Sequence, residues 1–189
     1  MKAIPKNDFK KLLDYIDRLP ETDRRAVWCK QRDALLFRML YYYGMRVSEA
    51  VELPIDNIRG GSILIRGKKH GNYQAYSTAC IADRLDKWLA VRPDSPWLFP
   101  ARGTPEKHIS RQAVNSRMME YGLACGVDRK WLHPHSIRHR TGVDLADSGC
   151  SIIEIMSVLR HKTPMQSIEY SRNSAEYTRE VQSKLKIGK

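Results

Sequence analysis

The sequence predicts a mainly α-helical single domain with one small antiparallel β-hairpin. Along most of the chain, apolar residues recur at spacings of three and four, as expected for helices that bury one face. The stretch from residue 57 to 79 differs, because two short runs rich in β-branched and aromatic residues flank a glycine-containing turn. At 189 residues the chain can bury one core without disulfides. Its four scattered cysteines predict reduced thiols rather than a zinc site.

Positive charge is the main feature of the composition. The chain has 33 Lys and Arg against 21 Asp and Glu, which gives a formal net charge of +12. Clustered basic residues of this kind predict a polyanionic partner such as nucleic acid. No apolar run approaches the roughly 20 residues of a membrane span, and no signal peptide opens the sequence. We therefore expect a cytoplasmic protein with no membrane partner.

Three helices are predicted before the hairpin. They are a helix capped by Asn7 that ends near Leu19, a helix over residues 33–43 that follows a polar loop at 21–25 and is stopped by Gly44, and a short helix capped by Ser48. Arg46 then lies in the tight turn between the last two helices. Because a turn held on both sides can aim a side chain, Arg46 is a candidate site residue. A surface ion pair with Glu49 is the alternative.

The middle of the chain is predicted to hold the hairpin and two further helices. The elements are a turn over 57–61, strands over 62–65 and 73–79, a helix over 81–91 with Leu89 inward, an extended connection over 93–105, and a helix from Ser110 to Cys125 with Leu123 on its buried side. The hairpin tip carries Lys68 and Lys69, so positive charge is concentrated there. Three polar residues of the last helix are predicted to face outward and, with Lys69, to contact DNA, and a solvated charged face is the alternative for the helix. They are Arg111, Asn115 and Arg117.

The C-terminal third contains the most informative spacing. Pro134 suits the first turn of a helix and Gly149 its end, which predicts a helix over 134–147. His135 and Arg138 are three residues apart on one face of that helix, where an imidazole and a guanidinium can bind one phosphate. A second helix is capped by Ser151 and Glu154 in a capping-box pattern. His161 falls at its end, and Tyr170 follows on a short element after Pro164.

The ordered set Arg46, His135, Arg138, His161 and Tyr170 resembles the tyrosine recombinase (phage integrase) family. The pattern of that family is Arg, Lys, His-x-x-Arg, His or Trp, and then a nucleophilic Tyr about nine residues later. Tyr170 stands nine residues after His161, and the resemblance extends from about Asp8 to Tyr177. It implies the catalytic-domain fold of the family and a general-acid Lys on the hairpin. Lys68 is the first choice for that role, and Lys69 stays open as the alternative.

The resemblance also implies a reaction and its partners. Tyr170 would attack a phosphodiester of double-stranded DNA and form a 3′-phosphotyrosine, while Arg46 and Arg138 clamp the phosphate and His135 and His161 assist. No metal or cofactor is implied, and related enzymes work as tetramers on paired sites. The apolar stripe of the tail, which is Tyr177, Val181 and Leu185, is expected to pack on its own domain or on a neighbouring protomer.

Several alternatives stay open at this stage. Arg160 stands where the family usually has Gly before its second His, which changes the turn that carries His161. The separate N-terminal DNA-clamping domain of most relatives is absent from the sequence. The chain is then either a piece of a longer integrase or a short enzyme resembling the fimbrial-switch invertases. Rival functions are a type IB topoisomerase, a DNA-binding protein that has lost catalysis, and a metal site at His133, His135 and His139.

Overall fold

The computed structural model describes residues 3–67 and 71–171, which form helices joined by two small antiparallel sheets. The helices are α1 (Lys6–Asp17), α2 (Arg24–Tyr42), α3 (Val47–Val51), α4 (Ala79–Leu89), α5 (Arg111–Ala124), α6 (Pro134–Asp147), α7 (Ile152–Leu159) and α8 (Pro164–Ser171), with 3₁₀ turns at Ile55–Asn57 and Arg129–Trp131. The strands are β1 (Ile58–Arg59), β2 (Ser62–Gly67), β3 (Gly71–Tyr76), β4 (Pro100–Ala101) and β5 (Thr104–His108). The first three pair in the order β1-β2-β3, and β4 pairs with β5.

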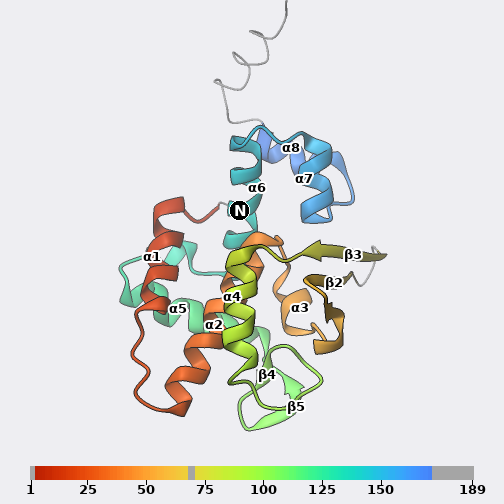
Figure 1. Ribbon diagram of the computed structural model, residues 1–189. Helices are drawn as coiled ribbons and strands as arrows, with labels where there is room; N and C mark the ends of the chain where they lie inside the picture. Colours follow the sequence, from red (N-terminus) through yellow and green to blue (C-terminus); the bar gives the residue numbers. More distant parts are fainter. Residues whose placement is uncertain (1–2, 68–70, 172–189) are drawn as a thin grey trace, which may run out of the picture.

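Helix α2 is the centre of the hydrophobic core. Every residue from Asp33 to Leu40 on this helix is buried, and α2 packs against α1, α3, α4 and α6. Figure 1 shows α6, α7 and α8 together at one end of the molecule, the β2–β3 hairpin near α3, and the β4–β5 pair toward the opposite end. None of the described helices combines the length and the apolar character that crossing a membrane would require.

The structure confirms the predicted elements around the C-terminal motif. Helix α6 begins at Pro134 and ends at Asp147 as predicted, and α7 is preceded by the Ser151–Glu154 capping box. The Ser110 hydroxyl caps α5 by accepting a hydrogen bond from the Ala113 backbone N–H. The β-hairpin is also present, with Ile63 opposite Ala75. Strong local capping signals explain why these boundaries could be predicted.

Helix starts in the N-terminal half were predicted wrongly. Asn7 is not a cap, because α1 begins at Lys6 after Pro5. Helix α2 begins at Arg24 rather than residue 33, and the Asp23 carboxylate caps it by accepting from the Ala26 N–H. Residues 26–29 are apolar, but they form one continuous run between basic residues and not a spacing of three and four, so the pattern did not reveal this part of the helix. Arg46, not Ser48, occupies the N-cap position of α3.

Several further predictions in the middle of the chain were wrong. Residues 93–105 are more than an extended connection, because β4 and the start of β5 lie there and pair with each other. Strand β1 occupies part of the predicted turn at 57–61. Helix α4 starts at Ala79, so the second hairpin strand ends earlier, at Tyr76. Leu89 and Leu123 were expected to be buried but are 39% and 52% exposed. Both lie at the end of a helix, where the core no longer covers the apolar stripe.

Candidate active site

The turn between α2 and α3 presents the Arg46 guanidinium beside a buried carboxylate. Gly44 has a positive φ of 50°, and a Cβ at this position would come within 2.4 Å of Leu159 Cδ2, so only glycine fits this turn. The Arg46 backbone N–H donates to Glu49 Oε2 at 2.8 Å, and Arg46 Nη1 donates to Glu49 Oε1 at 2.8 Å. The ion pair considered as an alternative therefore exists. It still leaves the Arg46 side chain 38% exposed and available to a ligand.

Arg138 ties this turn to the end of α7. Arg138 is only 2% exposed, and its two Nη groups donate to the Gly44 and Leu159 carbonyl oxygens. Burial, followed by the nearby Arg46 and Arg160 guanidinium groups, lowers the pKa of Arg138 to about 9. The side chain is therefore still protonated at neutral pH. Arg46 and Arg138, hereafter the guanidinium pair, form a concentrated positive site that favours an anion such as phosphate.

Three histidines and Tyr170 lie next to the guanidinium pair and form what we call the histidine–tyrosine cluster. The His135 and His139 rings are 4.4 Å apart in an edge-on arrangement. The Tyr170 hydroxyl is hydrogen-bonded to His139 Nδ1 at 2.9 Å. The His161 ring is stacked on that of Tyr170 at 6.1 Å, and His161 Nδ1 is 2.8 Å from the hydroxyl of the buried Ser167. The phenol is thus held between imidazoles from α6 and from the segment after α7.

Two histidines of this cluster, His135 and His161, are neutral at physiological pH. Burial is the main cause that lowers the pKa of His135 to about 4, and the neighbouring His139 and Arg138 add to it. Burial followed by Arg138 and Arg46 lowers the pKa of His161 to about 4 as well. A neutral imidazole can donate one hydrogen bond to a phosphate oxygen without adding charge to an already cationic site.

We predict that these histidines make the protein less stable below neutral pH. In the unfolded chain they bind protons near pH 6.5, but in the folded chain only near pH 4. The contribution of these two histidines to the free energy of unfolding is therefore fully present above pH 6.5 and is lost as the pH falls toward 4. Because both rings are partly exposed and solvent screens the effect, we expect a loss of about 1 kcal/mol at pH 5, or about 3 °C in Tm. Thermal unfolding of the wild type and of a His135→Gln/His161→Gln variant at pH 7 and pH 5 measures it. An equal loss in both proteins would contradict the assignment.

Gly142 allows the Tyr170 ring to lie directly on helix α6. A Cβ built at Gly142 would be 2.6 Å from Tyr170 Cζ and 2.7–2.8 Å from its neighbouring ring atoms. Such distances are too short for any real contact, so a side chain at residue 142 must displace the phenol. A glycine inside a helix costs stability, and here the close approach of Tyr170 is the reason for it.

We predict that Gly142→Ala lowers the rate of the DNA cleavage that the family resemblance implies, without lowering stability. Alanine should favour the helix by roughly 0.5–1 kcal/mol. It must also push the Tyr170 hydroxyl away from His139, and a displacement on the order of 1 Å can cost about 100-fold in rate. The test is single-turnover cleavage together with the Tm. Asp147→Ala, a change on the same helix away from Tyr170, serves as the control, and an unchanged rate in Gly142→Ala would refute the prediction.

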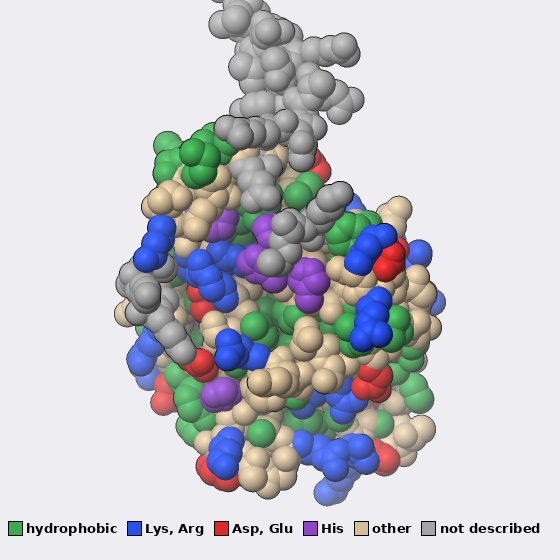
Figure 2. Space-filling model, turned by 180° about the vertical axis from the view of Figure 1, so that it is seen from behind, with side chains coloured by type: hydrophobic (Ala, Val, Ile, Leu, Met, Phe, Trp, Pro, Cys, Tyr) green, Lys and Arg blue, Asp and Glu red, His purple; other side chains and the backbone are tan. Residues whose placement is uncertain are grey.

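The structure brings together five of the predicted site residues, which are Arg46, His135, Arg138, His161 and Tyr170. Figure 2 shows histidine side chains gathered on one face with Lys and Arg side chains beside them. Lys68 and Lys69 lie outside the described residues, although the β2 strand that leads to them is described. Arg111 and Asn115 are exposed on α5, a helix that carries none of the clustered residues. Arg117 is instead paired with Glu120 at 2.9 Å.

The histidines proposed as a metal site have other partners. His133 Nδ1 accepts a hydrogen bond from the Ser136 backbone N–H and so caps α6. His139 Nδ1 is engaged with the Tyr170 hydroxyl. Within residues 3–67 and 71–171 there is no group of three His, Cys, Asp or Glu side chains arranged to hold a metal ion.

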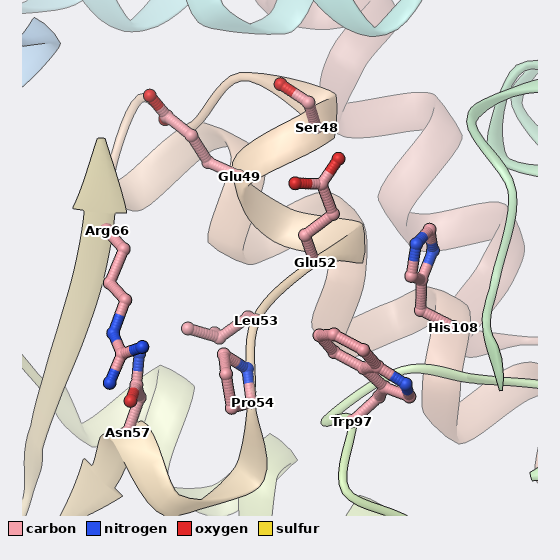
Figure 3. A pocket seen from close by; sticks show the side chains of 9 residues that line it. All are labelled: Ser48, Glu49, Glu52, Leu53, Pro54, Asn57, Arg66, Trp97 and His108. Carbon is pink, nitrogen blue, oxygen red and sulfur yellow. The ribbon is translucent and has the colours of Figure 1, made fainter. Parts of the chain in front are cut away.

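A cleft of about 400 Å³ opens beside the α2–α3 turn. Its lining comes from α3 and the segment after it, from β2, from the loop that carries Trp97 and from His108 at the end of β5 (Figure 3). Glu49 comes from α3 and Glu52 from the residue that follows it, while the Arg66 guanidinium lies near Asn57. The cleft contains none of the five clustered residues. It adjoins the site through Glu49, whose carboxylate holds Arg46.

Sequence reasoning missed three residues of the site. His139 was considered only as a metal ligand, yet its Nδ1 is hydrogen-bonded to the Tyr170 hydroxyl. Its position four residues after His135 could have indicated that it lies on the same face of the helix. Glu49 was considered only as a surface partner, yet its carboxylate is nearly buried between two arginines. Arg160 was noted only as a departure in a turn, and no local pattern indicates that it folds back onto Glu49.

Comparisons with known proteins agree with this architecture. Tyrosine recombinase XerD of Agrobacterium fabrum is 27% identical over 184 residues, covering 84% of this chain and 55% of the relative. Tyrosine recombinase XerA of Thermococcus kodakarensis is 28% identical over 191 residues, covering 98% of this chain and 63% of the relative. The chain thus spans somewhat more than half the length of these relatives. The crystal structure of XerH site-specific recombinase bound to difH substrate, a pre-cleavage complex, matches with a TM-score of 0.80 at 21% identity. That match covers 97% of this chain and 54% of the XerH chain.

The fold is therefore that of a tyrosine recombinase catalytic domain, as the sequence predicted. Residues 2–176 match the phage integrase family, and the chain belongs to that family.

Proposed function

We propose that this chain catalyses site-specific DNA recombination through a covalent 3′-phosphotyrosine intermediate. The observation that carries the proposal is the Tyr170 hydroxyl, bonded to His139 Nδ1 at 2.9 Å beside the guanidinium pair. A phenol next to concentrated positive charge and an imidazole is suited to attack a phosphodiester. Membership of the phage integrase family supports the same chemistry.

The proposed step exchanges one phosphodiester for another. The Tyr170 oxygen attacks phosphorus, and its bond forms while the bond from phosphorus to the 5′-oxygen breaks. The phenol proton passes to His139 Nδ1, and the leaving 5′-oxygen takes a proton from Lys68, with Lys69 as the alternative donor. A free 5′-hydroxyl from the same or a partner strand then attacks the phosphotyrosine and restores the DNA. The number of phosphodiester bonds is unchanged, so no ATP is consumed.

The guanidinium pair would hold the two non-bridging phosphate oxygens. Charge gathers on these oxygens in the transition state, where preorganised donors contribute most. Arg138 is held rigidly by two backbone carbonyls, so its remaining N–H groups are fixed in direction. The neutral His135 and His161 would add hydrogen bonds from either side. Each of these groups would then act on the same phosphate.

Double-stranded DNA is the proposed partner. The net charge of +12 favours a polyanion, and Arg111 and Asn115 are exposed on α5 where they can reach it. Recombination joins two sites, so we infer a tetramer on paired sites from chains that are monomers alone. Exposed Ile153 and Met165, 78% and 67% exposed, offer apolar surface for such contacts. The cytoplasm, with the nucleoid, is the location that this substrate implies.

A covalent-trapping experiment tests the proposal. Nicked duplexes tiled across the DNA that flanks the gene are incubated with the chain, so that a cut fragment diffuses away and traps the covalent complex. We expect a protease-sensitive, SDS-resistant complex and a nucleotide-modified peptide containing Tyr170. The absence of such a complex on every duplex would favour a DNA-binding protein without catalysis. Rapid relaxation of a supercoiled plasmid without any preferred site would favour a type IB topoisomerase.

A further inference from the structure

Arg160 has a backbone conformation that glycine normally adopts. It follows α7 directly, with φ 53° and ψ 49°, and among the described residues it is the one non-glycine residue with positive φ. This left-handed conformation is sterically unfavourable for a residue that carries a side chain. Helices commonly end this way with glycine for that reason. An arginine in this place implies that its side chain makes contacts strong enough to offset the strain.

The Arg160 side chain makes those contacts with the α2–α3 turn, with α3 and with the β-hairpin. Residue 160 is only 9% exposed. Its Nη1 donates to the Tyr43 carbonyl oxygen at 3.0 Å, and its Nη2 donates to the Gly44 carbonyl oxygen at 3.0 Å and to Glu49 Oε2 at 2.8 Å. The guanidinium also lies 5.3 Å over the Tyr73 ring, which is on the hairpin strand β3. Arg160 therefore connects the His161 segment, the α2–α3 turn and the hairpin.

The Glu49 carboxylate is shared between Arg160 and Arg46. Arg160 binds Oε2, and Arg46 Nη1 binds Oε1 at 2.8 Å. Burial alone would raise the pKa of Glu49, but Arg160 and the hydrogen bonds from Arg46 outweigh it and hold that pKa below its usual value. The carboxylate is thus ionised and fixed from one side, so that its other oxygen can orient Arg46. The charge of Arg160 is meanwhile balanced within the protein and is not presented to solvent.

We propose that Arg160 is a positioning residue that orients Arg46 through Glu49 and locks the His161 segment against the α2–α3 turn. Arg160 does not touch the phosphate in this assignment. The inference rests on the proposed function, because it assumes that Arg46 binds a DNA phosphate. It predicts that loss of Arg160 slows the chemical step and leaves DNA affinity unchanged.

The test compares Arg160→Gly, Glu49→Gln and the double variant in the full chain. Glycine tolerates the left-handed backbone, so the turn itself is preserved. With saturating amounts of the best-trapped nicked duplex, we expect Arg160→Gly to slow single-turnover cleavage about 10- to 100-fold, with Kd for the duplex changed less than threefold. Because both residues act through Arg46, the double variant should be no slower than the slower single variant, within about twofold.

Arg92→Gly provides a matched control. Arg92 also bonds loop carbonyls, those of Ser95 and Trp97, but it lies outside the site. We expect it to lower the Tm and to leave the cleavage rate of the folded protein unchanged. Thermal unfolding of every variant shows which of them are folded at the assay temperature, and the rates are measured below the lowest Tm.

The possible outcomes separate the two proposals. If the wild type cleaves and Arg160→Gly cleaves equally fast, or if its loss appears only in Kd, the positioning role is overturned and the proposed function stands. Rate losses that multiply in the double variant would also overturn the role. If the wild type traps no duplex while the Tm values still show Arg160 and Glu49 to be coupled, the proposed function fails. Arg160 then stabilises the fold by joining the α2–α3 turn to the end of α7 and has no role in catalysis.

Discussion

Tyr170→Phe is expected to abolish the covalent complex while leaving the folded protein able to bind DNA. The substitution removes only the hydroxyl, so the ring still lies on Gly142 and beside His161. The hydroxyl that is hydrogen-bonded to His139 Nδ1 is then gone. Loss of a covalent nucleophile typically lowers the rate by 10⁴-fold or more. We therefore expect no trapped product on the nicked duplex, with Kd within twofold of the wild type and an unchanged Tm.

Two other tyrosines serve as controls for this experiment. The Tyr121 hydroxyl donates to Asp33 Oδ2 at 2.8 Å inside the core, and burial and that carboxylate raise the pKa of Tyr121. Such a phenol is a poor nucleophile, so Tyr121→Phe should still cleave DNA. Tyr177 lies outside the described residues, and Tyr177→Phe is tested because of its proximity in sequence. Covalent trapping by Tyr170→Phe would transfer the role of nucleophile to another residue.

Arg138→Lys is expected to slow cleavage by about 100- to 1000-fold, the typical cost of losing one well-placed donor. Lysine keeps a positive charge but has no planar fork. It cannot satisfy the Gly44 and Leu159 carbonyl oxygens and also present fixed donors to a phosphate. The same substitution should cost about 1–3 kcal/mol of stability, because a buried carbonyl is left unpaired. Single-turnover cleavage and thermal unfolding measure the two effects separately.

Arg140→Lys is the control for Arg138→Lys. Arg140 lies two residues further along α6 and is paired with Asp144 at 2.9 Å and with Asp147 at 3.4 Å. Lysine keeps the positive charge toward both carboxylates, so the cleavage rate of the folded protein should remain close to wild type. Because the Arg140 side chain is only 12% exposed, a lower Tm is expected. If Arg140→Lys were as slow as Arg138→Lys, the loss would reflect a general effect on α6 and not a specific contact with phosphate.

Local chemistry explains which parts of the fold were predictable. Proline at the first turn of α6 and the capping box of α7 are signals contained within a few residues, and both elements were predicted to the residue or nearly so. The start of α2 was missed although Asp23 caps it, because the apolar residues 26–29 form one continuous run that does not show helical spacing. The β4–β5 pair was missed for a related reason. Each of its strands is short, and neither shows an alternation of polar and apolar residues long enough to detect.

The sequence was sufficient to indicate the family and the type of site. The signal is the order and spacing of five residues, which can be read without knowing the fold: Arg46, His135, Arg138, His161 and Tyr170. The contacts that hold the site are of another kind. His139 with Tyr170, Arg138 with Gly44, and Arg160 with Glu49 join residues 31, 94 and 111 positions apart. Only folding brings such groups together, since neither partner carries a local mark of the other. The residue types and their order were therefore determined by the sequence itself, while the tertiary structure decided which carboxylate, carbonyl and imidazole keep each of them in position.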